Sequence, residues 1–340
     1  MPFRFLASVL WKPAIDARNY LYDRGLLPVR RLRSPVISIG NLTLGGTGKT
    51  PLVIHVARLI IRLGKAPVLL SRGYKRRRST PMTILPPGAA AERPAADLGD
   101  EAALVRIHVP EIWLGISPDR YRAGSAIERA LSDAVIILDD GFQHRKLKRD
   151  LDVVLIDPTQ PLADNRIFPR GSLREPVTAV RRCHAVVING DPAEAGPAEI
   201  RKCIAQLKAD GLIFHCIQQI SSLKPLAGRV SGTITPAGEG DPVFLVAAIG
   251  NPQRFRRDVE GLKLEIRGCR FFRDHHELRP QEWEACWREA SSRGARYMLT
   301  TEKDVVKLDR EPGFPLYVAV QSTHVVETEL FEDLVRRCVG

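Results

Sequence analysis

The stretch Gly40-Asn41-Leu42-Thr43-Leu44-Gly45-Gly46-Thr47-Gly48-Lys49-Thr50-Pro51 decides the fold of this chain. It follows the apolar run Val36–Ile39 and precedes the amphipathic segment Leu52–Leu63, so a strand, a glycine-rich loop and a helix are predicted in that order. In such a loop the backbone N–H groups surround phosphate oxygens, and the start of the helix adds its dipole. The stretch therefore predicts a site for the phosphates of a nucleotide.

Two side chains of this loop have predicted roles of their own. Lys49 is expected to reach the β- and γ-phosphates, and Thr50 is expected to bind Mg²⁺. Thr43 stands where the commoner form of the motif has its first glycine, so the loop fits the GGxGKT variant. The residues predicted to contact the nucleotide are Thr43, Gly45, Gly46, Thr47, Gly48, Lys49 and Thr50.

Apolar runs alternate with helical patterns through the first two thirds of the chain. The runs are nearly continuous, as expected of strands that are covered on both faces of a parallel sheet. The sequence therefore predicts a doubly wound, mostly parallel α/β domain of the P-loop NTPase type. The candidate strands are Val36–Ile39, Val68–Leu70, Val135–Leu138, Val153–Ile156 and Ala185–Ile188.

A stretch rich in proline and glycine, residues 224–242, is interpreted as a hinge between two domains. It separates a nucleotide-binding domain, residues 31–223, from a smaller C-terminal α/β domain, residues 243–340. The smaller domain is expected to contain the apolar run Val243–Ile249, a helix over Pro280–Arg293, and strands at Tyr297–Thr300 and Leu316–Val320.

Residues 1–30 mix aromatic and aliphatic side chains with basic ones, among them Arg4, Lys12, Arg18 and Arg24. This pattern is typical of an amphipathic helix that lies in a membrane interface. A helix packed on the domain fits the pattern too, and Pro13 is expected to interrupt the helix.

The composition narrows the class of protein. Of the 340 residues, 44% are hydrophobic and 26% are charged, which excludes wholesale disorder. The net charge of +12 favours an anionic partner: phosphate, nucleic acid or anionic lipid. The six cysteines form no CxxC pair, which favours a reducing compartment over a disulfide framework. The apolar runs are too short to span a bilayer, so neither export nor a transmembrane segment is expected.

Two pairs of acidic residues are candidate site residues. Asp139 and Asp140 follow an apolar run, and carboxylates at the end of a parallel strand beside a phosphate loop can hold Mg²⁺. Which of the two binds the ion stays open, and a solvated turn is the alternative. Asp100 and Glu101 stand at a predicted helix start, where an N-cap is commoner than a catalytic base.

Three further loops are dense in charge: residues 170–176, 273–277 and 301–304. Arg174 is a candidate to clamp a phosphate, with a surface ion pair as the alternative. The adjacent His275 and His276 form a poor metal site if they lie on a strand, because neighbouring side chains then point to opposite faces.

Taken in order along the chain, these segments resemble the tetraacyldisaccharide 4'-kinases, the lipid A 4'-kinases of bacterial outer-membrane biogenesis. The resemblance covers most of the chain, and Lys75 and Ala102 depart from the glycine and proline expected at those positions. The matching motifs are GNLTLGGTGKTP at 40–51, SRGY at 71–74, GDE at 99–101, DDGFQH at 139–144, GSLREP at 171–176, DHH at 274–276 and TEKDVVK at 301–307.

The resemblance implies a kinase that needs ATP and Mg²⁺ and is bound peripherally to the cytoplasmic face of the bacterial inner membrane. It would phosphorylate the 4'-hydroxyl of a tetraacylated glucosamine disaccharide 1-phosphate, giving lipid IVA. An Asp100–His275 dyad, split between the two domains, would activate the hydroxyl when the domains close. The implied metal ligands are Thr50, Glu101, Asp139 and Asp140. The implied substrate or phosphate contacts are Asn41, Arg72, Tyr74, Gln143, His144 and Arg174.

Two other classes of protein share parts of this pattern. A P-loop GTPase or ATPase of the GGxGKT class would share the first half, but Thr301–Asp304 has Lys and Asp adjacent rather than in the Asn-Lys-x-Asp spacing. A nucleotide-dependent membrane-binding protein without lipid turnover is the second alternative. Nucleic acid is not an expected partner because the sequence contains no recognisable nucleic-acid module. Protein partners stay unknown from the sequence.

Overall fold

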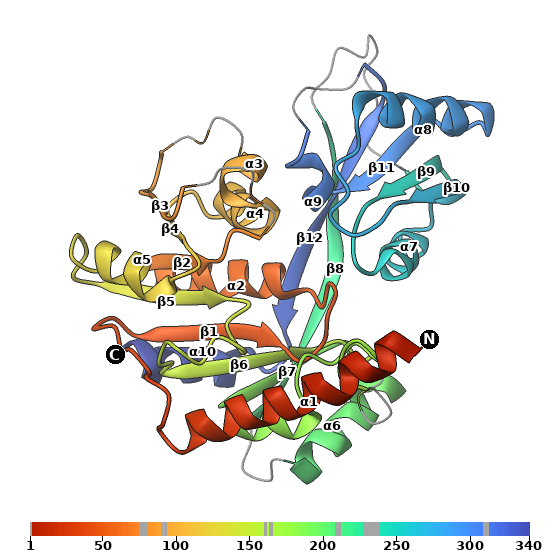
Figure 1. Ribbon diagram of the computed structural model, residues 1–340. Helices are drawn as coiled ribbons and strands as arrows, with labels where there is room; N and C mark the ends of the chain where they lie inside the picture. The colour runs from red at the N-terminus through yellow and green to blue at the C-terminus, as the bar shows by residue number, and fades with distance from the viewer. Residues whose placement is uncertain are drawn as a thin grey trace. The chain divides into compact units, whose positions relative to one another are not determined.

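The computed structural model describes residues 2–74, 76, 80–89, 91, 94–159, 162, 166–207, 212–226, 238–308 and 313–340, with side chains from Trp11 onwards except that of Pro94. The chain forms two compact units, each made of segments that are separate in the sequence. Unit 1 contains Met1–Ala90, Val105–Gln218 and Thr323–Gly340, and unit 2 contains Ala91–Leu104 and Gln219–Ser322. Figure 1 labels their helices and strands.

Unit 1 is built on a sheet whose strand order is β8-β7-β6-β1-β5-β2-β4-β3. Neighbouring strands run parallel from β8 to β4, and β3 pairs antiparallel with β4. The strands are β1 (Val36–Asn41), β2 (Ala66–Ser71), β3 (Thr83–Leu85), β4 (Trp113–Ile116), β5 (Ala134–Asp139), β6 (Leu151–Ile156), β7 (Ala185–Asn189) and β8 (Leu212–Pro225).

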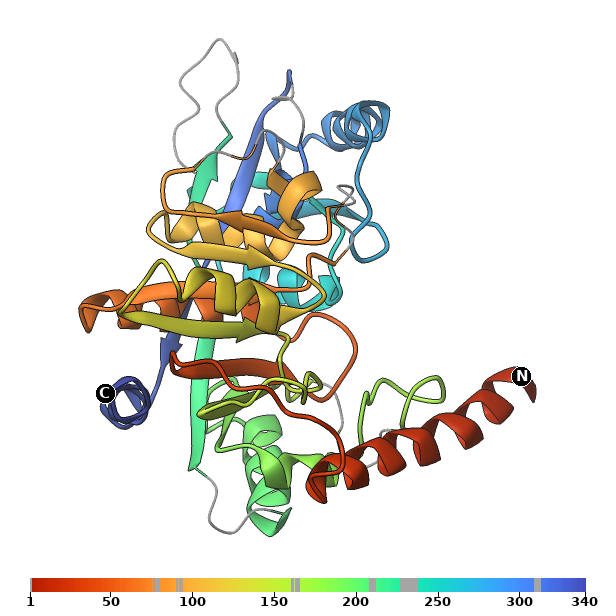
Figure 2. The same ribbon diagram turned by 60° about the vertical axis from the view of Figure 1, so that its left-hand side comes forward.

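Helices cover both faces of this sheet. Residues of α5 (Arg120–Ile127) and α6 (Ala195–Leu207) join core clusters with alternate residues of the strands, such as Ile136 and Val154. The intervening strand residues are also buried, and α2 (Lys49–Arg62) packs against β1, β2 and β5. In Figure 2, α2 and α10 (Thr328–Val339) lie on one side of the strands and α6 on the other. The arrangement confirms the predicted doubly wound α/β fold.

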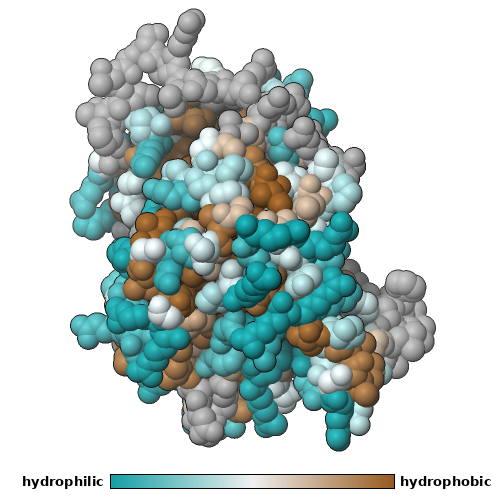
Figure 3. All heavy atoms as spheres, turned by 90° about the vertical axis from the view of Figure 1, so that its left-hand side faces the viewer, coloured by the Kyte–Doolittle hydropathy of each residue, from teal (hydrophilic) through white to brown (hydrophobic). Residues whose placement is uncertain are grey.

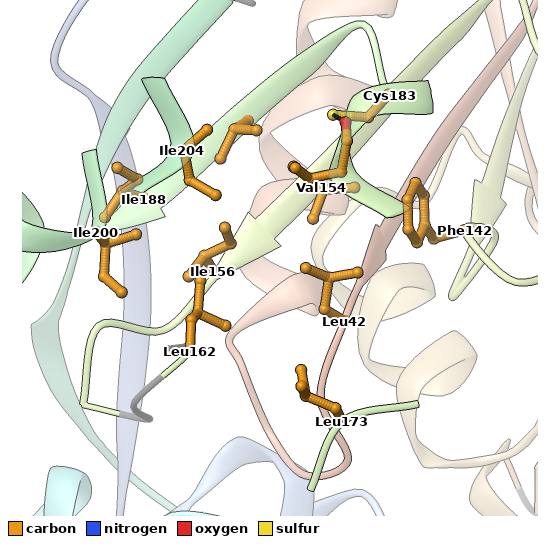
Figure 4. Close-up of a cluster of buried hydrophobic side chains, with 12 residues drawn as sticks. Leu42, Phe142, Val154, Ile156, Leu162, Leu173, Cys183, Ile188, Ile200 and Ile204 are labelled. Carbon is orange, nitrogen blue, oxygen red and sulfur yellow. Dashed lines mark hydrogen bonds between the residues drawn. The ribbon is translucent and has the colours of Figure 1, made fainter. Parts of the chain in front are cut away.

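One buried cluster connects the loops at the carboxyl ends of the strands (Figure 4). Leu42 lies in the loop after β1, Phe142 in the turn after β5, and Leu173 in the loop before the 3₁₀ helix η1 (Val177–Arg182). All three side chains are at most 2% exposed. Each of these three residues is adjacent to, or two residues from, a polar candidate site residue. Their burial in one apolar cluster therefore fixes the positions of the three loops that carry those polar groups.

Unit 2 is a smaller α/β layer with the strand order β10-β9-β11-β12, and its strands run parallel. Along β9, Val243, Leu245 and Ala247 pack in the cluster that includes α7, while Phe244 and Val246 pack in the cluster that includes α8. The elements are α7 (Pro252–Glu260), α8 (Pro280–Ser292), α9 (Glu302–Val305), β9 (Pro242–Ala247), β10 (Glu265–Phe271), β11 (Tyr297–Thr301) and β12 (Leu316–Val325), with α3 (Pro94–Leu98) and the start of α4 (Asp100–His108).

Strands β8 and β12 each begin in one unit and end in the other. Within unit 1 the Val326 N–H donates to the His215 carbonyl, and within unit 2 the Leu226 N–H donates to the Leu316 carbonyl. Since the residue numbers rise along one strand as they fall along the other, the two strands pair antiparallel. The chain therefore enters unit 2 on β8 and returns on β12.

The compact units divide the chain differently from the predicted domains, 31–223 and 243–340. Residues 323–340 belong to unit 1, because Phe331 and Val335 of α10 are fully buried and Phe331 meets the rings of His55 and Phe214. Residues 91–104 belong to unit 2. Of the predicted hinge, residues 227–237 lie outside the described residues, 224–225 end β8 and 242 begins β9.

The N-terminal segment forms one helix, α1 (Pro2–Asp23), that continues through Pro13. The expectation that Pro13 interrupts the helix is therefore wrong. Proline has no N–H to donate to the carbonyl four residues before it. Pro13 is exposed, so water can form that hydrogen bond instead. Within the described part of the chain, no helix combines the length and the apolar character that crossing a membrane requires.

Candidate active site

The predicted phosphate loop joins β1 to α2 in unit 1, as the sequence pattern indicated. Gly48 caps the helix with φ 84°, a left-handed conformation that favours glycine. A Cβ at this position would lie 2.0 Å from Oε1 of Gln218. Two independent constraints, backbone conformation and space, therefore require glycine immediately before Lys49.

Buried side-chain amides form hydrogen bonds with the loop. Asn41 Nδ2 donates to the Thr43 carbonyl at 2.8 Å and to Thr47 Oγ1 at 3.1 Å. Gln218 Nε2 donates to the Gly48 carbonyl at 2.7 Å, and Asn189 Nδ2 donates to Gln218 Oε1 at 3.0 Å. Asn41, predicted as a substrate or phosphate contact, is 0% exposed and orders the loop itself. These amides bind two loop carbonyls and the Thr47 hydroxyl, and so they fix the shape of the loop.

Sequence reasoning missed Asn189 and Gln218. Asn189 ends β7, and a polar residue at the carboxyl end of a buried parallel strand is a pattern that could have identified it. Gln218 lies within β8, a strand with no clear apolar run, so no local pattern pointed to it.

Lys49 and Arg174 both pair with Asp140. Lys49 Nζ lies 3.4 Å from Asp140 Oδ1, and Arg174 Nη1 lies 2.6 Å from Asp140 Oδ2. Burial by itself raises the pKa of Asp140, but the charges of Lys49 and Arg174 outweigh it and lower the pKa to about 2. Arg174 Nη1 also lies 3.4 Å from Gln143 Oε1, and Gln143 Nε2 donates to the Asn41 carbonyl at 3.0 Å. The structure thus brings Lys49, Asp140, Gln143 and Arg174 together.

The oxygen atoms of Thr50, Asp139 and Asp140 suit Mg²⁺, which prefers hard oxygen donors. Asp139 is 5% exposed, and Ser71 Oγ lies 3.4 Å from its Oδ2. Over the ranges that the structure describes, no group of three or more His, Cys, Asp or Glu side chains could hold a metal ion alone. The set still fits Mg²⁺, because this ion keeps several waters and takes further oxygens from bound phosphates.

A basic cavity of about 560 Å³ opens in unit 1. It contains two predicted contacts, Arg72 and His144, and Arg120, whose Nη1 lies 3.4 Å from His144 Nδ1. Burial, followed by the charges of Arg120 and other nearby cations, lowers the pKa of His144 to about 4, so its imidazole is neutral at pH 7. Tyr74, a further predicted contact, is 57% exposed. The cavity is lined by Pro28, Arg30, Arg72, Pro118, Asp119, Arg120, Tyr121, His144 and Lys146.

The predicted dyad is formed within unit 2. Asp100 Oδ2 lies 2.7 Å from His275 Nδ1, and both side chains are largely buried. Asp100 begins α4, while His275 lies in a turn after β10 with φ 61°. Burial alone raises the pKa of Asp100, but the hydrogen bond with His275 and the charges of Lys303 and Lys307 lower it overall. Asp100 is therefore a carboxylate at neutral pH.

The structure differs from the expected arrangement of the dyad and places the two neighbouring histidines outside a strand. The dyad is not split between two compact units, because residues 91–104 pack in unit 2 together with His275. The neighbouring histidines do not lie on a strand, since β10 ends at Phe271. His275 contacts Asp100, while His276 lies 3.1 Å from Glu282 Oε1 and stacks on Phe272.

Glu101, predicted as a metal ligand, pairs with Lys303 Nζ at 3.0 Å in unit 2. The other predicted metal ligands lie in unit 1, so neither unit by itself contains the whole predicted set. Lys303 belongs to the TEKD segment, and sequence reasoning had assigned it no role. Burial alone lowers the pKa of Lys303, but Glu101 and Asp100 raise it overall, so Lys303 stays charged.

Known proteins are similar to this chain over most of its length. Residues 3–339 match the family described as Tetraacyldisaccharide-1-P 4'-kinase. A tetraacyldisaccharide 4'-kinase of Syntrophus aciditrophicus is 39% identical over 320 residues, covering 90% of this chain and 85% of that protein. The corresponding protein of Anaeromyxobacter dehalogenans strain 2CP-C is 38% identical over 306 residues, covering 89% and 80%.

A solved structure is similar over almost the whole chain. It is the crystal structure of LpxK from Aquifex aeolicus in complex with ATP, with a TM-score of 0.75 and 28% sequence identity. The match covers 99% of this chain and 98% of that one. Sequence and fold therefore indicate the same relatives.

Proposed function

The chain belongs to the tetraacyldisaccharide 4'-kinase family, and from this premise we propose how its residues carry out the reaction. It is an ATP-dependent kinase of lipid A biosynthesis. The γ-phosphoryl group of ATP passes to the 4'-hydroxyl of the tetraacylated disaccharide 1-phosphate. A P–O bond forms at the 4'-oxygen, the bond to ADP breaks, and the hydroxyl loses its proton.

The phosphate loop of unit 1 binds the ATP. The observation that carries this assignment is the loop itself, with Gly48 left-handed, its carbonyls satisfied by Gln218 and Asn189, and Lys49 at the start of α2. Lys49 pairs with Asp140, so bound phosphates would compete with that carboxylate for the ammonium group. Arg174 and Lys49 then stabilise the charge that develops on the transferred group.

Thr50, Asp139 and Asp140 hold Mg²⁺ in this proposal. The ion supplies neutralisation of the phosphate charge when it is bound. Asp139 and Asp140 stand at the end of β5, and Ser71 at the end of β2 contacts Asp139. Glu101, the fourth proposed Mg²⁺ ligand, pairs with Lys303 in unit 2.

The Asp100–His275 pair accepts the proton of the sugar hydroxyl. A hydroxyl is a weak nucleophile at neutral pH, so a positioned base accelerates its attack. The 2.7 Å contact orients the imidazole, and Lys303 helps to keep Asp100 ionised. Asp100 is largely buried, and His275 lies in a turn with a left-handed backbone. Both features support His275 as the base in unit 2.

The basic cavity of unit 1 recognises the phosphate of the substrate. Arg72 and Arg120 line it, and burial and neighbouring charges keep His144 neutral, so this imidazole can form hydrogen bonds without adding charge. Arg fork geometry suits a phosphate ester. Gln143 and Tyr74 complete the proposed substrate contacts.

The membrane surface is the proposed location of the enzyme, at the cytoplasmic face of the inner membrane. The substrate has four acyl chains and stays in a bilayer, so the enzyme must approach the headgroups. Trp11 and Tyr20 of α1 are 50% and 55% exposed, and the net charge is +12. On the face shown in Figure 3, hydrophobic and hydrophilic residues are interspersed among the coloured residues.

One assay tests the assignment. The parental protein and Lys49→Ala are incubated with radiolabelled ATP and the disaccharide 1-phosphate in detergent micelles, and the lipids are separated by thin-layer chromatography. Label is expected in a bis-phosphorylated lipid for the parental protein only. Hydrolysis of ATP without labelled lipid would contradict the proposal and favour a GGxGKT-class ATPase or a nucleotide-dependent membrane-binding protein.

A further inference from the structure

Glu175 is a fully buried carboxylate that joins α1 to the loops of the phosphate site. It is 0% exposed and directly follows Arg174 in the chain. Arg182 of η1 binds it with both Nη atoms, at 3.0 Å to Oε1 and 2.8 Å to Oε2. From α1, Arg18 Nη2 lies 3.3 Å from Oε1 and Asn19 Nδ2 lies 3.0 Å from Oε2.

A second contact joins α1 to the turn after β5. Arg145 Nη1 donates to the Asn19 carbonyl at 3.1 Å, and Arg145 Nη2 lies 2.6 Å from Asp23 Oδ1. Arg145 directly follows His144 and is two residues from Gln143. The same turn of α1 therefore contacts both loops that carry candidate site residues.

From Glu175 the contacts continue to Asp140 by two routes. Arg182 Nη2 donates to the Phe142 carbonyl at 3.1 Å, and its guanidinium lies 3.7 Å from the centre of the Phe142 ring, two residues after Asp140. Arg174, next to Glu175, binds Asp140 at 2.6 Å, and its N–H donates to the Leu42 carbonyl at 2.7 Å. Figure 4 shows Leu42, Phe142 and Leu173 in the buried cluster beneath these loops.

We propose that Glu175 is a positioning residue for phosphoryl transfer, and that α1, by binding Glu175 through Arg18 and Asn19, helps to hold Asp140 and Arg174 in place. The inference rests on the proposed function, in which Asp140 and Arg174 act on ATP. The helix proposed to meet the lipid surface then contributes directly to the geometry of the phosphate site.

Charge and burial explain why this arrangement matters for activity. A buried carboxylate needs hydrogen bonds to all of its oxygens, and each partner lost leaves part of the charge uncompensated. When Glu175 loses a partner, we expect the loop that carries Arg174 and Glu175 to shift, because this shift disturbs the rest of the fold least. Phosphoryl transfer depends on sub-ångström positioning, so a small shift lowers kcat even when the ligands still bind.

A matched pair of substitutions separates positioning from membrane attachment. Arg18→Ala and Arg24→Ala each remove one positive charge from the same end of α1, but Arg24 contacts the ring of Tyr20 and not Glu175. Both variants are assayed at saturating ATP and saturating disaccharide 1-phosphate in mixed micelles, together with flotation on anionic vesicles. We expect kcat of Arg18→Ala to fall at least about fivefold further than that of Arg24→Ala, with similar flotation. Equal values of kcat would overturn the proposal.

Glu175→Gln tests the carboxylate itself, with Glu332→Gln as its control. Glu332 also pairs with an arginine, Arg62 at 2.6 Å, but lies on α10 and outside the proposed site. Glu175→Gln is expected to lower kcat about tenfold with little change in the KM for the lipid, and Glu332→Gln is expected to keep the parental kcat. A parental kcat in folded Glu175→Gln contradicts the proposal.

Two further measurements distinguish failure of this proposal from failure of a variant to fold and from failure of the proposed function. Asn19→Ala removes one uncharged donor from the Glu175 carboxylate, so it tests the same contact if Glu175→Gln does not fold. The kcat of the folded variant is expected to fall about threefold, and a parental kcat counts against the proposal. Lack of lipid phosphorylation by the parental protein would instead mean that the proposed function has failed.

Discussion

Asp100 and His275 are 175 residues apart in the sequence, yet Oδ2 of the aspartate lies 2.7 Å from Nδ1 of the histidine. Both belong to unit 2, since the segment Ala91–Leu104 packs with Gln219–Ser322. Lys303, from the segment after β11, lowers the pKa of Asp100 and pairs with Glu101. A carboxylate, an imidazole and a compensating cation from three separate segments thus form one cluster.

The dyad is expected to act as a unit. Asp100→Ala and His275→Ala should each lower kcat strongly and change the KM for ATP little, because we propose that ATP binds to the phosphate loop of unit 1. The double variant should lose little more than either single variant, since residues that act together fail together. Steady-state kinetics of the three variants measure this. A double variant slower by the product of the single losses would mean that the two residues act independently.

Lys49→Ala and Thr50→Ala are each expected to lower turnover at least about 10²-fold. In the proposed function, the first substitution removes the cation that faces the phosphates, and the second removes a Mg²⁺ ligand. Lys65→Ala, just after α2, is the matched control for the loss of a lysine and should stay near the parental rate. Near-normal activity in the folded Lys49→Ala variant would contradict the assignment of this loop as the ATP-binding site.

Asp140 makes the stability of the protein depend on pH. The pKa of Asp140 is lowered to about 2 in the folded protein, against about 3.9 for an unperturbed aspartate. Between these values the unfolded chain binds more protons than the folded one, so the free energy of unfolding falls as the pH drops from about 5 towards 2. Urea unfolding of Asp140→Asn should show a shallower decline over this range. Parallel declines for parental and variant proteins would contradict the ion-pair account.

Deletion of part of α1 is expected to weaken vesicle binding. A deletion of residues 1–14 ends before Ile15, which is 7% exposed, and leaves Arg18 and Asn19 on Glu175. It should reduce flotation with anionic vesicles and raise the apparent KM for the lipid, with ATP affinity nearly unchanged. Deletion of residues 1–25 should reduce flotation similarly and lower kcat as well. Equal flotation of parental and shortened proteins at low and high salt would place the membrane contact elsewhere.

Gly48→Ala should disrupt the phosphate loop. The added Cβ meets Gln218 at 2.0 Å, and the left-handed φ disfavours any residue with a Cβ. We expect ATP affinity to fall at least about tenfold, measured by calorimetry, since loop N–H groups must turn away. Gln218→Ala in the same chain should restore only part of the affinity, because the backbone strain remains. Full affinity in Gly48→Ala would show that neither constraint holds.

Much of unit 1 could be predicted because its determinants are local. The five predicted strands lie within β1, β2, β5, β6 and β7, each a run of residues buried on both faces. The glycine loop lies where the strand–loop–helix pattern placed it. Elements at the edge of a sheet or shared by the two units were harder to predict. The sequence analysis missed β10, which alternates exposed and half-buried residues at the end of its sheet, and β8, which passes between the units and has no simple periodicity. Of β12, the analysis predicted only the first half, Leu316–Val320.

The sequence by itself determined the phosphate loop, the acidic strand end at Asp139 and Asp140, and the family resemblance, because each is encoded in contiguous residues whose spacing sets the local backbone. Only the tertiary structure decided which distant segments share a surface. It placed Asp100 beside His275 in one unit, returned α10 to the helix that carries Lys49, and buried Glu175 against α1. Such contacts depend on burial and charge compensation between segments far apart in the chain, and no local pattern contains that information.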